Sequence, residues 1–200
     1  MMNSVSDKIM ERIQQKGQGW VFIPSDFFDL GNRNAVYSAL RRLRGKEKIR
    51  RFSKGLYDFP RYSRFWNDFG VPDQEGIVDA VARQAQCAIL PSGATAANQL
   101  GLSEQVPAKL EYVWSKKTKR LQIGNSTFIF YYAPQSWVAN CGHSIAGVIL
   151  QALGWFGVNS IDDNMVKYLV RLLAKLSKQD KELLKANAPD WVIPIIHRTI

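Results

Sequence analysis

The chain has 200 residues, of which 46% are hydrophobic and 12% aromatic. This composition excludes an intrinsically disordered protein, because disordered chains lack the apolar side chains that fill a core. The formal net charge is +10, with 14 Lys and Arg against 6 Asp and Glu in residues 1–64, and 13 against 11 in residues 65–200. The excess of positive charge in the first third predicts a site for a polyanion there.

The segment before residue 20 is polar and amphipathic, so we expect no signal peptide. The longest apolar run, 145–158, is too short to span a bilayer. Cys87 and Cys141 are the only cysteines, which excludes a disulfide framework. We therefore expect a cytoplasmic protein with reduced thiols, of one large or two small domains.

The first predicted element is a helix that Ser4 or Ser6 caps and Gly17 ends, because apolar residues recur every four positions between them. A short β-prone run, residues 20–23, follows this helix and stops at Pro24. These two elements form the beginning of an N-terminal domain.

A second, shorter helix is predicted over residues 26–30, with Ser25 as its N-cap and Gly31 after its last turn. Asn32 then caps a third helix at once, and this helix runs to Gly45. Two helices joined so tightly are typical of a helix-turn-helix.

The third helix has two different faces. Its apolar residues, at spacings of three and four, would pack on the first two helices: Val36, Ala39, Leu40 and Leu43. The opposite face carries Arg33, Asn34, Tyr37, Ser38 and Arg41. Arg and Asn read guanine and adenine edges, and Ser and Tyr reach phosphates, so this face is typical of a recognition helix.

A basic hairpin follows the third helix. Residues 49–52 and 56–59 are predicted to pair around Lys54 and Gly55, and Pro60 stops the second strand. Further candidate DNA contacts between the helix end and the hairpin tip are Arg42, Arg44, Lys48, Arg50, Arg51, Ser53 and Lys54. Helix, strand, two helices and a hairpin make a winged helix-turn-helix, for which double-stranded operator DNA is the expected partner. The alternative is a solvated charged surface that mediates protein contacts.

These features predict an α+β protein. A winged helix-turn-helix domain occupies residues 1–64, a packed linker residues 65–72, and a mixed α/β domain residues 73–200. The second domain is expected to contain helices over 73–86, 93–100 and 145–156, an apolar segment at 89–91, and strands over 110–115, 120–123 and 127–132. Two more helices are predicted after Asp162 or Asp163 and after Ser177.

A possible secondary basic surface lies near the C-terminus. Lys167, Arg171, Lys175 and Lys178 follow one another at spacings of four, four and three, on the side opposite the apolar residues of the same helix. The stripe is either a solvated helix face, an extension of the DNA footprint, or a contact for an acidic protein surface.

No residue pattern predicts catalysis. Residues 91–95 lack the spacing and the lysine of a phosphate-binding loop, and Cys141 and His143 have no partners at zinc-ligand spacing. Asp162 and Asp163 are explained as helix caps. We therefore expect a chain that is not an enzyme, without metal or cofactor.

Three segments carry a resemblance to a known family: RRFSKGLYDFP at the wing, AILPSGATAANQLGLSEQVP, and the strand pair KRLQIGNSTFIFYY. With them the chain resembles the AbiEi-type antitoxins of type IV toxin–antitoxin (abortive infection) systems. The resemblance implies two roles, repression of its own operon through the winged helix and neutralisation of a nucleotidyltransferase-like toxin through the second domain. The alternatives are a plain winged-helix transcription regulator with a ligand-sensing or dimerisation domain, and a nucleic-acid-modifying enzyme.

Overall fold

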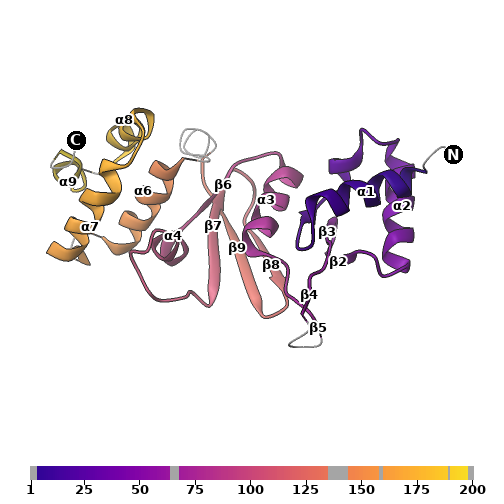
Figure 1. Ribbon diagram of the computed structural model, residues 1–200. Helices are drawn as coiled ribbons and strands as arrows, with labels where there is room; N and C mark the ends of the chain where they lie inside the picture. Colours follow the sequence, from indigo (N-terminus) through magenta and orange to yellow (C-terminus); the bar gives the residue numbers. More distant parts are fainter. Residues whose placement is uncertain (1–3, 64–67, 135–143, 158–159, 189, 198–200) are drawn as a thin grey trace. The chain divides into compact units, whose positions relative to one another are not determined.

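The computed structural model describes residues 4–63, 68–134, 144–157, 160–188 and 190–197 of the chain (Figure 1). The fold is α+β, as the sequence predicts. The chain divides into two compact units, Met1–Gln86 and Cys87–Ile200. We describe each unit by itself.

The first unit begins with α1 (Val5–Lys16), which Ser4 and Asp7 cap reciprocally and Gly17 ends. The elements that follow are β1 (Val21–Phe22), the 3-10 helix η1 (Pro24–Phe27), α2 (Arg33–Gly45), β2 (Arg50–Ser53), β3 (Leu56–Asp58), β4 (Tyr62–Ser63), β5 (Asp68–Phe69) and α3 (Gln74–Ala85). Strands β1, β3 and β2 form an antiparallel sheet in that order. Helices α1, η1 and α2 with this sheet are a winged helix-turn-helix, and the β2–β3 hairpin is its wing.

The core of this unit gathers the apolar faces of α1 and α2 around a cluster of aromatic rings. Ile9 and Ile13 of α1 are fully buried, and the Phe22 and Phe27 rings meet edge to face at 5.4 Å. The four-residue spacing that predicts α1 from the sequence is therefore the spacing that fills the core.

The predicted second helix over 26–30 is wrong in kind and position. The structure has one 3-10 turn over Pro24–Phe27, followed by irregular turns to Gly31. The reason is local: the Asp26 carboxylate accepts a hydrogen bond from the Ile23 backbone N–H at 3.0 Å, so the turn begins at Pro24, two residues before an α-helix capped by Ser25 would begin.

The predicted domain boundary is also too early. Helix α3 packs on the winged helix: a Cβ added to Gly76 would lie 3.1 Å from the Val21 side chain, and Arg83 donates to the Val21 carbonyl oxygen at 3.1 Å. The first unit thus extends to Gln86. Of the predicted packed linker, residues 68–69 form β5 and pair with β4, while 65–67 lie outside the described residues.

The second unit contains a four-stranded sheet in the order β6-β7-β9-β8. Its strands are β6 (Ile89–Pro91), β7 (Lys109–Trp114), β8 (Lys119–Ile123) and β9 (Ser126–Tyr132), and its helices are α4 (Gly93–Gln99), α6 (Ile145–Phe156), α7 (Asp163–Ala174), α8 (Lys178–Asn187) and α9 (Ile193–His197). Strands β7 and β9 are parallel, whereas the other neighbours are antiparallel.

The helices of this unit share one apolar core. Leu90 of β6, Ile149 and Leu153 of α6, Leu169 of α7 and Leu184 of α8 are all buried within it. The predicted helices and strands of this region are confirmed to within two residues at most ends, but α9 was not predicted. Within the described residues no helix is long and apolar enough to cross a membrane.

Candidate nucleic-acid interface

Helix α2 presents its predicted recognition face to solvent. Val36, Ala39 and Leu40 are completely buried and Leu43 is 6% exposed. The predicted contact residues Arg33, Asn34, Tyr37, Ser38 and Arg41 are all exposed. Asn32 is the N-cap of the helix, because its side chain accepts a hydrogen bond from the Ala35 N–H at 2.9 Å.

Two side chains of this face are held by a residue that sequence reasoning missed, Phe28. The Arg33 guanidinium lies over the Phe28 ring, 5.2 Å from its centroid. The Tyr37 ring meets the same ring edge to face at 6.4 Å. Phe28 therefore restricts Arg33 and Tyr37 before any ligand arrives, which lowers the entropy cost of binding. An aromatic residue four positions before the helix cap Asn32 is the only sequence signal for this role.

The turn that carries Phe28 is itself fixed to α1. Arg12 forms a forked ion pair with Asp29, with N–O distances of 2.8 and 2.6 Å, and donates to the Asp26 carbonyl oxygen at 2.7 Å. The hydrogen bonds from Arg12 lower the pKa of Asp29. These contacts connect η1 and the following turn to α1.

The wing divides the predicted basic residues into two groups. Arg51 and Lys54 are exposed, and the Arg51 Nε donates to the Ser53 carbonyl oxygen at 3.2 Å, while the Ser53 side chain is half-buried. Arg50, which the sequence analysis counted among the DNA contacts, forms a forked ion pair with the buried Asp58, at 3.0 and 2.6 Å. Its guanidinium also donates to the Gly70 carbonyl oxygen at 2.8 Å. Arg50 therefore holds the base of the wing together.

Helix α3 contacts the tip of the wing. The Gln84 side-chain amide donates to the Lys54 carbonyl oxygen at the wing tip, with a distance of 3.4 Å. Arg83 forms an ion pair with Asp26 at 3.1 Å. The Lys54 backbone is thus hydrogen-bonded to a helix that the sequence analysis assigned to the second domain.

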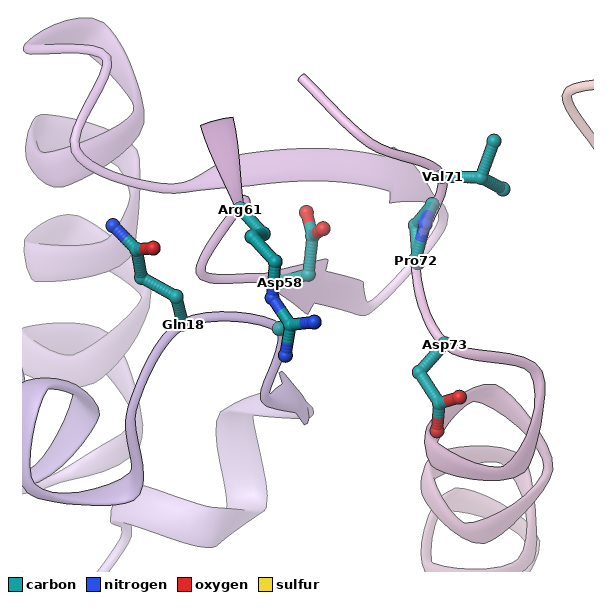
Figure 2. A pocket seen from close by; sticks show the side chains of 7 residues that line it. Gln18, Asp58, Arg61, Val71, Pro72 and Asp73 are labelled. Atoms are coloured by element: carbon teal, nitrogen blue, oxygen red, sulfur yellow. The ribbon is translucent and has the colours of Figure 1, made fainter. Parts of the chain in front are cut away.

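A hollow of about 370 Å³ opens at the base of the wing (Figure 2). Figure 2 shows the Arg61 side chain in its middle, with Gln18 on one side and Asp58 and Asp73 on the other. Both carboxylates are already occupied, Asp58 by Arg50 and Asp73 by the Gly76 N–H at the start of α3. The hollow therefore presents no free carboxylate to a ligand.

The remaining basic residues of the interface, Arg42, Arg44 and Lys48, are exposed. Arg42 lies on the flank of α2 that faces α1, where its guanidinium donates to the Ser6 hydroxyl at 3.1 Å. Arg42 and Lys48 line one groove together with Lys46, a residue absent from the predicted contacts. The groove therefore separates Arg42 and Lys48 from the face that carries Asn34 and Arg41.

The four residues of the predicted secondary basic surface lie in the second unit. Lys167, Arg171 and Lys175 are exposed on α7, and Lys178 is the exposed first residue of α8. Within the described ranges none of the four has an acidic partner at ion-pair distance. Arg171 and Lys175 line a hollow of about 170 Å³ with Tyr168, whose hydroxyl donates to the Leu100 carbonyl oxygen at 2.7 Å.

No metal site is found among the residues that the structure describes, since no three His, Cys, Asp or Glu side chains gather there. Cys141 and His143, which the sequence analysis weighed as half of a metal site, lie outside the described residues.

The fold defines an α+β protein with an N-terminal winged helix-turn-helix unit. The chain belongs to a family of unknown function, DUF6088, whose match covers residues 8–182. No curated protein matches the chain. Among solved structures, the crystal structure of the RV2827C protein from Mycobacterium tuberculosis is similar, with 16% sequence identity and a TM-score of 0.44, over 100% of this chain and 77% of that one.

Proposed function

We propose that the first unit binds duplex DNA sequence-specifically, with α2 in the major groove and the β2–β3 wing on the flanking backbone. One observation carries this proposal: α2 buries its entire apolar face, while the opposite face exposes side chains suited to base edges and phosphates. The positive charge concentrated in residues 1–64 suits the phosphate backbone of such a ligand.

The direct test is a gel-shift titration of the DNA upstream of the gene with the full chain. Replacing Arg33, Tyr37 and Arg41 together by Ala should weaken specific binding, by about 1–3 kcal/mol for each side chain that reaches a base edge. The matched control replaces Lys8 and Lys16, which are exposed and lie on α1 rather than on the recognition helix α2. Unchanged affinity in the triple variant, with a normal thermal melt, contradicts the assignment of α2.

We further propose that the chain is the antitoxin and autorepressor of a bacterial toxin–antitoxin operon and acts in the cytoplasm. In this proposal the second unit neutralises a nucleotidyltransferase-like toxin. Support comes from the resemblance of the wing, the segment at residues 88–107 and the β8–β9 strand pair to AbiEi-type antitoxins. We propose no catalytic activity for the chain.

Co-expression in a growth assay separates this role from that of a plain regulator. The full chain should rescue cells that express its cognate nucleotidyltransferase-like toxin, whereas a fragment ending at Gln86 should bind DNA without rescue. Full rescue by the fragment would move the antitoxin role to the first unit. Absence of rescue by the full chain favours a regulator whose second unit senses a ligand or dimerises.

The basic stripe of α7 extends the proposal to the second unit. Replacing Lys167, Arg171 and Lys175 by Glu should leave the thermal melt unchanged, because all three side chains are exposed. If the stripe binds DNA phosphates or the toxin, this variant loses DNA affinity or rescue. If neither changes, the stripe is a solvated face.

A further inference from the structure

A groove between the start of α1 and the end of α2 concentrates positive charge apart from the recognition face. We call it the α1–α2 groove; it has a volume of about 350 Å³. It is lined by Ser4, Ser6, Asp7, Met10, Gln14, Arg42, Leu43, Lys46 and Lys48. Its size is at the lower end of the range of small-ligand pockets, about 300–1,000 Å³.

Most positive charges of the groove have no acidic partner among the described residues. Within the described part of the chain, the side chains of Lys46 and Lys48 have no hydrogen-bond or ion-pair partner. Arg42 donates only to the neutral Ser6 hydroxyl, at 3.1 Å, so its charge is not compensated by that bond. Arg42, Lys46 and Lys48 therefore line the same groove without a described acidic partner at ion-pair distance.

The single acid of the lining, Asp7, is already occupied. Its carboxylate accepts hydrogen bonds from the Ser4 backbone N–H at 3.0 Å and from the Ser4 hydroxyl at 2.7 Å. These bonds, and more weakly the charges of Lys46 and Arg42, lower the pKa of Asp7, so it is a carboxylate near neutral pH and offsets one cation. The groove therefore has a net charge of two positive charges, and Met10 and Leu43 are the apolar residues of its lining.

We propose that the α1–α2 groove binds a phosphoryl group, through Lys46, Lys48 and the free N–H groups of Arg42. Two lysines as point charges and one guanidinium, which can donate two parallel hydrogen bonds, suit a phosphate group with several acceptor oxygens. The phosphoryl group comes either from the DNA backbone beside the bases that α2 reads or from a free phosphorylated small molecule. Only the first source rests on the proposed function.

The test uses the full chain and a double variant, Lys46→Gln with Lys48→Gln. Pyrophosphate binding is measured by isothermal titration calorimetry, and DNA binding by gel shift over a range of salt concentrations. The matched control is Lys8→Gln with Lys16→Gln, which removes the same charge from the same unit outside the groove. A second variant, Lys46→Arg with Lys48→Arg, keeps the charge and should keep binding.

Two results support the proposal and identify the source. If pyrophosphate binds the wild type and binds the Gln variant about tenfold more weakly, while DNA affinity is unchanged, the ligand is a free phosphorylated molecule. If DNA affinity falls and the slope of log K against log salt becomes shallower by about 1–2, the groove holds backbone phosphates.

Two results overturn the proposal. One is a Gln variant with a normal thermal melt that changes neither measurement. The other is a control variant that loses as much as the Gln variant, since the effect is then one of net charge. If the wild type binds pyrophosphate but no DNA, the groove is supported while the DNA-binding function fails, so the two failures are distinguishable.

Discussion

The ion pair between Arg50 and Asp58 predicts that this basic residue of the wing stabilises the fold and does not contact DNA. Asp58 is 1% exposed, and its two oxygens accept from the Arg50 guanidinium at 3.0 and 2.6 Å. Replacing Arg50 by Met keeps the apolar stem but leaves a buried carboxylate without these donors. The predicted consequence is a loss of stability rather than a loss of phosphate contacts.

The magnitude follows from burial. Breaking a fully buried ion pair by removing one partner costs about 3–5 kcal/mol. Arg50 is 31% exposed, however, and the hollow in Figure 2 reaches Asp58, so water can hydrate part of the orphaned carboxylate. We therefore expect Arg50→Met to lower the free energy of unfolding by about 2–3 kcal/mol. Adding Asp58→Asn should recover at least about 1 kcal/mol, because the uncompensated charge is removed.

Urea unfolding of a fragment ending at Gln86, followed by Trp fluorescence, measures this cycle, since single small domains usually unfold in two states. Gel shifts with the same Arg50→Met variant measure the salt dependence of DNA binding. The reasoning is refuted if Arg50→Met changes the free energy of unfolding by less than about 0.5 kcal/mol, the usual range for surface substitutions. It is equally refuted if the substitutions at Arg50 and Asp58 are additive.

Two further predictions concern stability and a third concerns DNA affinity. Gly55 has φ +74°, and a Cβ there would lie 2.5 Å from the Gln84 amide nitrogen. Gly55→Ala should therefore lower the free energy of unfolding in urea by about 1 kcal/mol. The control is Gly45→Ala, whose Cβ would meet no atom within 4 Å and which should leave that free energy unchanged. Asp180 accepts hydrogen bonds from Ser177 at 2.6 Å and Ser144 at 2.7 Å, which lower its pKa below the ordinary 3.8. This contribution is present above about pH 4 and is lost as pH falls through the lowered pKa, so thermal melts of the wild type should fall further on acidification than those of Asp180→Asn. A fragment that ends before α3 should bind DNA more weakly than one ending at Gln86; equal affinity would show that the contact of α3 with Lys54 is dispensable.

The sequence alone determined the elements whose signals are local. The apolar spacing of α2, its Asn32 cap and the basic residues opposite Val36 and Leu40 are properties of one helix, and they predict its buried and exposed faces without any neighbour. The turn at Gly124 likewise predicts the β8–β9 hairpin, because the two strands are adjacent along the chain.

Only the tertiary structure decided what each exposed or basic residue contacts. Arg50 and Arg51 are neighbours of the same type in sequence, but the pleat of β2 directs one to Asp58 and leaves the other exposed. Helix α3 has an apolar face that would suit either unit, and its place with the winged helix rests on contacts of Arg83 and Gln84 with residues 57 and 30 positions earlier. The parallel pairing of β7 with β9 is similarly non-local. Periodicity reports which face of an element is buried, whereas the partner on that face is fixed by the closure of long loops, which leaves no local pattern in the sequence.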